Sequence, residues 1–226
     1  MSDWWSYSLS DLLMFSAKTY YRMFELYNLA IWPAQLVAGI AGLAIIGCVA
    51  RGGVNSGTAA AALLAFCWLW VAWAFHSERY AAINSAGAIF AIAFAIEALL
   101  LLWVGSVRGR LAFVPVRDAI RCPALGLVAF AMLGYPLLAI VGGRPWVQME
   151  TFGVAPDPTA LATLGMLAMA RPGRYLLWPI PLLWCAISGA TLWTMQAADF
   201  WIGPLVALVA LSLARSGRVP RTSAEI

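Results

Sequence analysis

Apolar residues fill most of this chain in long runs that short polar stretches separate. Seven such runs follow one another: residues 29–50, 58–75, 85–106, 123–141, a shorter run ending at Ala170, 175–193 and 197–214. The connections between them are short and contain helix breakers such as Gly142 and Gly143. Because a helix of about 20 apolar residues can cross a bilayer, the pattern predicts an all-α integral membrane bundle of about seven transmembrane helices.

The N-terminal stretch follows a different pattern, in which charged and apolar positions occupy separate faces of one helix. Ser10 can cap a helix that runs to about Tyr27. Its charged residues recur at spacings of seven, four and three: Asp11, Lys18, Arg22 and Glu25. We therefore predict an amphipathic interfacial helix in residues 1–28, followed by the transmembrane bundle in residues 29–214 and a cytoplasmic basic tail in residues 215–226.

Composition agrees with a membrane protein. Hydrophobic residues make up 63% of the chain and charged residues 11%, with a mean hydropathy of +0.84. So few charges cannot cover the surface of a soluble domain of this length. The net charge of +4 is spread beside the apolar runs instead of forming a basic patch, which gives no indication of nucleic-acid binding. Trp68, Trp70 and Trp73 fit an aromatic belt at a membrane interface better than a cofactor site.

Arginine and lysine lie mostly on one side of the predicted spans. If the seven spans alternate in direction, ten lie on the C-terminal side: Arg51, Arg108, Arg110, Arg117, Arg121, Arg171, Arg174, Arg215, Arg218 and Arg221. The other four are Lys18, Arg22, Arg79 and Arg144. The positive-inside rule then predicts a bacterial inner-membrane protein with a cytoplasmic C-terminus. A re-entrant fifth run would change the split to five against nine, a weaker asymmetry.

Glu97 is the most informative residue, because it is the only charge in the apolar stretch 86–104. At about 1.5 Å per residue this stretch spans a hydrocarbon core of about 30 Å, which places Glu97 near the midplane. A carboxylate there costs about 2.5–3.5 kcal/mol on insertion scales. Glu97 therefore either binds an ion or substrate, or donates a hydrogen bond that only fixes helix packing; both interpretations remain open.

The fifth run contains the second unusual pattern, Pro156-Asp157-Pro158-Thr159. Proline disfavours helix in the residue before it and suits the first helical turn, so we predict Asp157 as the N-cap and Pro158 as the first residue of a short helix. That helix would begin inside the bilayer, as the broken helices of transporters do, and Asp157 would bind an ion or substrate. The alternative is an ordinary cap at a surface loop. We further expect Glu97 and Asp157 to face a common interior cavity.

His76 and Glu78 end the second run and are further candidates for ion or substrate binding. One histidine cannot provide two axial haem ligands, and its acidic neighbours make only a weak metal site. A hydrogen-bonding role at the membrane interface is therefore favoured for His76. The four cysteines show no CxxC or CxxxH spacing, which argues against a disulfide framework or a thiolate zinc site. No pattern identifies a cofactor or a metal.

Several stretches together resemble a bacterial family of multi-pass membrane proteins known only as a domain of unknown function. They are LSDLLMFSAKTYYRMFELYNLAIWPAQ, AWAFHSERYAAIN, FAIEALLLLW, PDPTALATLGML and LLWCAISGATLW, and they cover nearly the whole chain. The resemblance implies no activity. In relatives the position matching Asp157 can be a cysteine between two prolines, which implies soft-metal binding there. Here it is aspartate, so the resemblance does not carry thiolate chemistry to this chain.

Two functions follow from these patterns. One is a small transporter or channel for protons, metal cations or a small solute, built around Glu97 and Asp157. The other is a non-catalytic structural or accessory subunit of a larger membrane complex. We expect no enzyme, because the chain has no histidine cluster, nucleophile–base pair or nucleotide-binding fingerprint. The expected partners are the lipid bilayer and either further copies of the chain or other membrane subunits.

Overall fold

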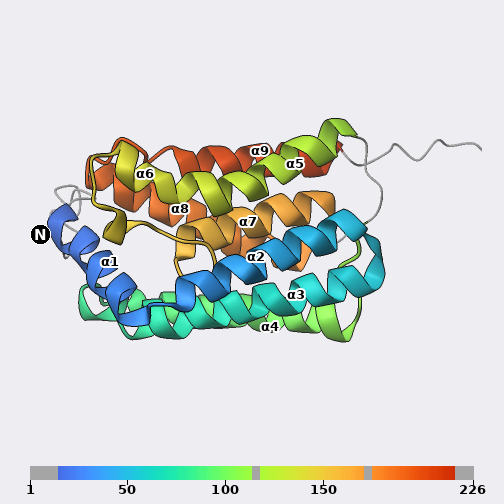
Figure 1. Ribbon diagram of the computed structural model, residues 1–226, viewed down its shortest axis with the longest axis horizontal. Coiled ribbons are helices and arrows are strands. Elements are labelled where there is room, and N and C mark those ends of the chain that lie inside the picture. Colours follow the sequence, from blue (N-terminus) through green and yellow to red (C-terminus); the bar gives the residue numbers. More distant parts are fainter. Residues whose placement is uncertain (1–14, 114–117, 171–174, 217–226) are drawn as a thin grey trace, which may run out of the picture.

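The computed structural model describes residues 15–113, 118–170 and 175–216, and within these ranges every regular element is helical. The helices lie roughly along one long axis, except for α1, which crosses one end of the bundle (Figure 1). The α-helices are α1 (Ala17–Ile31), α2 (Ala34–Arg51), α3 (Gly53–Trp70), α4 (Gly87–Leu100), α5 (Asp118–Ala129), α6 (Tyr135–Val141), α7 (Pro156–Met169), α8 (Pro179–Thr194) and α9 (Ile202–Ser216). The described part of the chain thus confirms the all-α fold.

In the described ranges, five helical stretches are long and apolar enough to cross a membrane. They are Ala34–Arg51, Gly53–Ala82, Gly87–Val107, Ala119–Val141 and Tyr175–Thr194. The two other predicted spans correspond to α7 and α9, which have 14 and 15 residues. Their lengths correspond to about 20 Å of helix, less than the thickness of a hydrocarbon core.

Helix α1 begins later than the sequence predicts. Ser16 is its N-cap, because the Ser16 side chain accepts a hydrogen bond from the backbone N–H of Thr19 at 3.2 Å. The predicted cap, Ser10, lies outside the described residues. Helix α1 also continues past Tyr27 to Ile31. Its buried face consists of Tyr20, Met23, Phe24 and Tyr27, so this face packs on the bundle.

Three of the long helices continue into π-helical stretches. These are η3 (Val71–Ser77) after α3, η5 (Leu101–Val107) after α4, and η6 (Phe130–Gly134) between α5 and α6. A π turn adds a residue to the helical turn and frequently occurs at functional sites. Here η3 contains His76, η6 is followed directly by Tyr135, and Glu97 lies one turn before η5.

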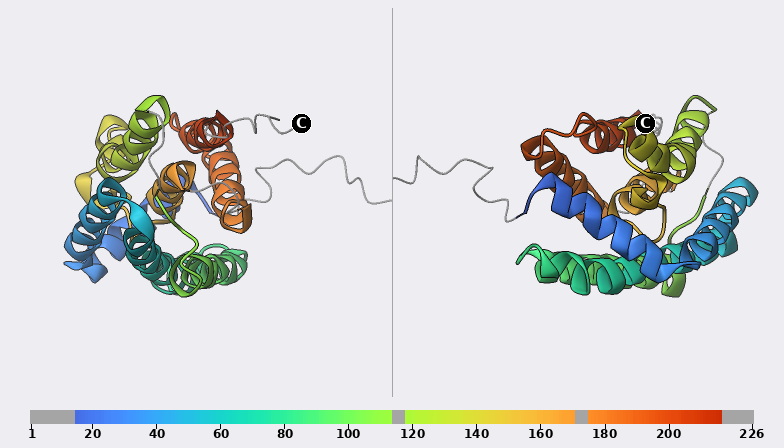
Figure 2. Two further views of the ribbon diagram at one scale, coloured as in Figure 1. Left: turned by 90° about the vertical axis from the view of Figure 1, so that its right-hand side faces the viewer. Right: turned by 60° about the vertical axis from the view of Figure 1, so that its left-hand side comes forward.

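Helix α7 lies in the centre of the bundle, and all fourteen of its residues are buried. Helices α3, α5, α8, α9 and the η6 stretch surround it, as the end-on view shows (Figure 2). It begins part of the way along the bundle, at the end of a long connection from α6 (Figure 1). The outer helices instead expose apolar side chains such as Ile40, Ile92 and Leu208, each more than 60% exposed. An apolar exterior is what lipid contact requires.

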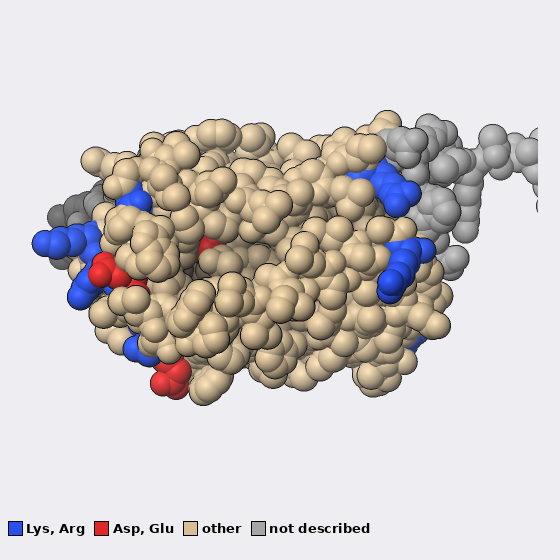
Figure 3. Space-filling view, viewed as in Figure 1, with Lys and Arg blue, Asp and Glu red and all other residues tan. Residues whose placement is uncertain are grey.

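Charged residues gather at the two ends of the molecule and leave a largely uncharged surface between them (Figure 3). Lys18, Arg22, Arg79 and Arg144 belong to α1 and to the connections beside it. Arg51, Arg108 and Arg215 belong to helix ends at the opposite end of the bundle (Figure 1). The predicted segregation of positive charge is therefore present in the described residues.

Candidate functional site

Helix α7 begins two residues earlier than predicted. Ala155 is its N-cap, with φ −114° and ψ 147°, and Pro156 is the first helical residue. Pro156 and Pro158 both suit the first turn of a helix. Ala155, which precedes Pro156, adopts the extended backbone that the residue before a proline favours. Asp157 is therefore not the N-cap. It lies inside the first turn and is 5% exposed, which excludes a surface cap.

The two prolines reduce the number of unpaired backbone groups at this buried helix end. The first four N–H groups of a helix have no partner within it, and proline carries no N–H. The N–H of Ala155 is bonded to the carbonyl of Thr151 at 2.9 Å. The first four positions are residues 155–158, so only the N–H of Asp157 is left without a proline or a backbone bond to account for it. Helix α7 can thus begin in the protein interior with little loss of hydrogen bonding.

Three side chains converge on the carboxylate of Asp157. Trp184 Nε1 donates to Oδ1 at 2.6 Å, and the hydroxyls of Tyr135 and Ser188 each donate to Oδ2 at 2.6 Å. Tyr135 begins α6, while Trp184 and Ser188 lie one turn apart on α8. Such donors stabilise the ionised form of a buried carboxyl. A carboxylate accepts about four hydrogen bonds, so roughly one acceptor position remains.

Thr159 fixes the backbone that leads into α7. Its hydroxyl donates to the carbonyl of Ala155 at 2.6 Å and accepts from the N–H of Gly153 at 2.9 Å. Gly153 has a φ of 79°, a conformation that side chains other than glycine's rarely adopt. The predicted broken-helix residues Pro156, Pro158 and Thr159 are all buried and lie in the first turn of α7.

Helix α1 supplies donors to the irregular connection between α6 and α7. Asn28 Nδ2 donates to the carbonyls of Val147 and Met149, both at 2.8 Å. The hydroxyl of Tyr27 donates to the carbonyl of Val154 at 2.8 Å. Irregular backbone inside a bundle is stable only where such partners exist. Helix α1 therefore stabilises the connection that leads to Asp157.

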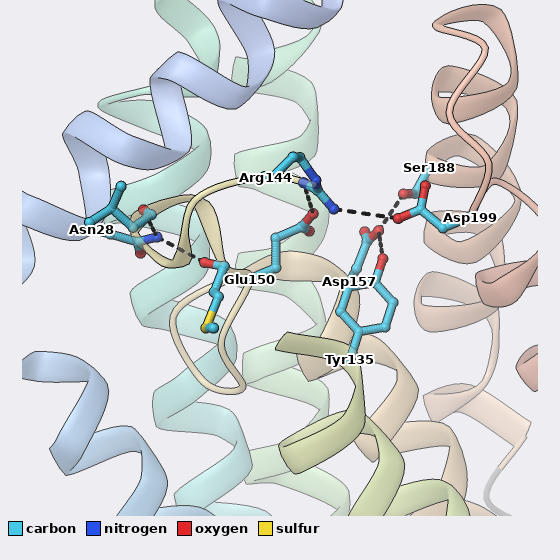
Figure 4. A network of polar contacts seen from close by, with 9 residues as sticks. Asn28, Tyr135, Arg144, Glu150, Asp157, Ser188 and Asp199 are labelled. Atoms are coloured by element: carbon cyan, nitrogen blue, oxygen red, sulfur yellow. Dashed lines mark hydrogen bonds and ion pairs between the residues drawn. The ribbon is translucent and has the colours of Figure 1, made fainter. Parts of the chain in front are cut away.

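One guanidinium faces two carboxylates beside Asp157 (Figure 4). Arg144 Nη1 lies 3.9 Å from Glu150 Oε1, and Nη2 lies 3.5 Å from Asp199 Oδ2. The guanidinium carbon of Arg144 also stands 4.2 Å from the ring centroid of Tyr21. Asp199 lies next to Ser188 and Asp157 in this view. These contacts join α1, the α6–α7 connection and the α8–α9 connection.

Glu150 is 4% exposed, and its Oε2 has no hydrogen-bond partner within the described residues. Burial raises the pKa of Glu150 above its ordinary value, and the nearby Asp157 charge raises it further, whereas Arg144 opposes the shift. Glu150 and Asp199 thus face one arginine, and Asp157 lies beside Asp199 (Figure 4). This part of the bundle therefore carries an excess of negative charge when all are ionised.

The structure corrects the interfacial interpretation of His76. The side chain is fully buried, and neither ring nitrogen has a hydrogen-bond partner in the described part of the chain. Its ring centroid lies 4.4 Å from that of Phe94 and 4.9 Å from that of Trp184. Because the same Trp184 binds Asp157, the structure brings His76 close to the aspartate site without direct contact.

Glu97 is also fully buried, and neither carboxyl oxygen has a hydrogen-bond partner among the described residues. No hydrogen bond or ion pair between described residues joins it to Asp157. Phe94, one turn before Glu97, has its ring centroid 5.1 Å from that of Trp184. The shared cavity for Glu97 and Asp157 therefore remains a prediction, with Phe94 and Trp184 between their helices.

Glu78 lies apart from this interior group. It is exposed and lines a cavity of about 750 Å³ between α1 and the connection from η3 to α4. The predicted ion-binding residues thus divide into a buried set and this surface carboxylate. Within the described ranges, no group of three or more His, Cys, Asp or Glu side chains has the geometry of a metal site.

Sequence reasoning missed Tyr135, Trp184, Ser188 and Arg144. A signal existed for Trp184 and Ser188, which are four residues apart and so share a face of one apolar helix. It also misassigned Trp68 to an aromatic belt. Trp68 is fully buried, and its Nε1 donates to the hydroxyl of Thr163 at 2.9 Å. Trp73, by contrast, is 59% exposed.

The chain belongs to a family described as a family of unknown function (DUF6064), whose family model matches residues 17–223. The match extends over the nine α-helices of the described residues. It confirms the resemblance to a family without assigned function. Neither a curated protein nor a solved structure matches the chain.

Proposed function

We propose that this DUF6064 protein is a small transporter or channel that carries protons or small cations across a membrane, with Asp157 as the carboxylate that the ion meets inside the bundle. The observation that carries the proposal is a helix with a buried start, α7, that presents a carboxylate at its first turn. Broken helices of this kind form the ion and substrate sites of many transporters.

The charges around Asp157 support a cation. Glu150, Asp157 and Asp199 outnumber Arg144, so their combined field attracts positive ions. Acidic atoms are also visible in a hollow of the otherwise apolar surface, toward the α1 end (Figure 3). That hollow supports access to the acidic residues from outside the bundle. Neighbouring carboxyls in such a site share a proton or bind a cation because both do not ionise readily.

Glu97 is the second carboxyl of the proposed path. It has no hydrogen-bond partner in the described residues, whereas Asp157 has three donors. Two buried carboxyls in such different environments suit different protonation states. We therefore assign Asp157 to ion binding and Glu97 to proton exchange, with no cofactor and no enzymatic step.

Membrane placement is part of the same proposal. We propose seven crossings in a bacterial inner membrane, in which the connection from α6 and the helix α7 together make the fifth. The C-terminus is then cytoplasmic, in agreement with the segregated arginines. Fusions of a reporter after Ser216 and after Gly109 test this arrangement, and a periplasmic reading at either position contradicts it.

The transport proposal is tested with purified protein in vesicles that contain a pH-sensitive dye. An imposed membrane potential should drive proton or cation flux in the wild type. Asp157→Asn and Glu97→Gln should abolish it while the thermal midpoint stays close to wild type, because both keep the side-chain shape. Glu78→Gln, at the exposed carboxylate, is the matched control and should retain flux.

Absence of flux with protons and with mono- and divalent cations would contradict transport. If the chain shows no flux and other subunits co-purify with it from native membranes in a stable, stoichiometric complex, the accessory-subunit function would be established instead. Wild-type flux in the Asp157→Asn variant would leave transport in place but remove Asp157 from the path.

A further inference from the structure

The cavity beside Glu78 lies at the level of a membrane interface. Six tryptophans in the described ranges are more than half exposed or at 50% exposure: Trp32, Trp73, Trp103, Trp146, Trp193 and Trp201. All but Trp103 lie directly after α1 or at the neighbouring ends of other elements (Figure 1). Tryptophan favours the depth of lipid headgroups, so these side chains mark that depth at the α1 end.

The wall of the cavity combines charged and apolar side chains. It has a volume of about 750 Å³, in the range of sites for small molecules. Its charged residues are Lys18, Arg22, Glu25, Glu78 and Arg79. Met23, Leu26 and Ile83 supply apolar surface. A ligand that fits this wall has charged groups at one end and hydrocarbon at the other.

Some of these charged side chains pair with one another, and others do not. Arg22 pairs with Glu25, and Gln148 Nε2 also donates to Glu25 at 3.3 Å. Lys18, Arg79 and Glu78 form no ion pair with any described residue. Among the described residues, two cations and one carboxylate of the same cavity are thus without an ion pair.

We propose that this cavity binds one membrane phospholipid with a phosphate and a primary ammonium in its headgroup. Lys18 and Arg79 receive the phosphate, because a phosphate anion suits two positive donors. Glu78 accepts from the ammonium, which a quaternary ammonium cannot replace because it has no N–H. The first acyl carbons lie along Met23, Leu26 and Ile83. The proposal rests on membrane placement of the chain and does not depend on transport.

The experiment uses the full chain in nanodiscs of equal phosphatidylethanolamine, phosphatidylglycerol and phosphatidylcholine, followed by native mass spectrometry. The wild type should retain one phosphatidylethanolamine per chain. The double variant Lys18→Gln/Arg79→Gln should lose about tenfold or more of that retention, since a loss of about 1.4 kcal/mol has this effect. Glu78→Gln should abolish the preference for phosphatidylethanolamine over phosphatidylglycerol and over phosphatidylcholine. Arg51→Gln, an exposed cation at the opposite end, is the matched control and should retain the lipid.

Four results would overturn the proposal. They are equal retention of the three lipids by the wild type, equal loss in the Arg51→Gln control, binding of soluble glycerophosphoethanolamine as tightly as the lipid, and lipid retention only after removal of residues 1–14. The last would make the chain's own N-terminal segment the occupant. A failure of the vesicle flux assay leaves this result unaffected, whereas failure of the chain to enter nanodiscs would contradict the membrane placement itself.

Discussion

The indole Nε1 of Trp184 donates a hydrogen bond of 2.6 Å to Oδ1 of Asp157, and both side chains are buried. This contact connects the start of α7 to the middle of α8. Trp184 also contacts the ring of His76, so its position determines how the aspartate site meets the aromatic interior.

Trp184→Phe should destabilise the protein, because it keeps a large ring but removes the donor to Asp157. Leaving a buried acceptor unpaired costs about 1–3 kcal/mol, and more for a charged group. The measurement is the thermal midpoint in detergent. Trp193→Phe, at an exposed position of the same helix, should have little effect. Equal midpoints for the two variants would show that the bond to Asp157 adds nothing to stability.

Glu97→Leu should leave stability unchanged or raise it. No described residue bonds the Glu97 carboxyl, so the substitution removes a buried polar group without depriving a partner. Ile96→Leu, the exposed neighbour, serves as the control for the thermal midpoint. A fall of several degrees for Glu97→Leu alone would reveal a bound water or ion that the carboxyl holds.

Asn28→Ala should weaken the connection between α6 and α7. The change removes the donor to two carbonyls, of Val147 and Met149, and each unpaired buried carbonyl costs about 1–3 kcal/mol. We expect a lower thermal midpoint and faster hydrogen exchange in residues 147–155. Leu29→Ala, the exposed neighbour, should change neither quantity. Unchanged exchange in Asn28→Ala would show that α1 does not support the connection.

Glu150 should make stability depend on pH. Its pKa is raised in the folded state by burial and by Asp157, so the folded protein favours the protonated form. This contribution is fully present below the ordinary pKa of 4.5 and is lost as the pH rises through the raised value. The unfolding free energy then falls by up to about 1.4 kcal/mol per pH unit.

Glu150→Gln should remove that part of the slope in unfolding free energy measured from pH 4.5 upward. Glu25→Gln is the control, because hydrogen bonds from Gln148 and Arg22 lower the pKa of Glu25. In this variant the unfolding free energy should still fall as the pH rises, as it does in the wild type. An unchanged profile in Glu150→Gln would assign the slope to other groups.

Hydropathy was sufficient to predict the helical bundle, and the two prolines indicated a helix start within two residues of the observed start of α7. The burial of Glu97 agrees with its place inside an apolar run, where a lone charge faces the protein interior. For Asp157 the sequence left a buried helix start and a surface cap both open. The partners of Asp157 did not follow. Tyr135, Trp184 and Ser188 are 22, 27 and 31 residues away in sequence, and their convergence depends on how neighbouring helices are rotated.

The same limit explains the errors at Trp68 and His76. Both lie in the segment Gly53–Ala82, where composition alone cannot tell the lipid-facing side from the interior. Trp68 faces Thr163 on α7, and His76 faces Phe94 on α4. Aromatic residues suit either environment. The buried side of this segment can therefore be identified only from the helices that pack against it.

The enclosure of α7 also constrains how the protein is made. A helix of 14 residues is too short to cross a bilayer alone, and two of the helices that cover it, α8 and α9, are synthesised after it. In the proposed membrane placement, α7 therefore cannot reach its final position until α9 has been synthesised. Assembly of the Asp157 site is then a late step, and in that placement chains that end before α9 would present the unfinished centre to lipid and to membrane proteases.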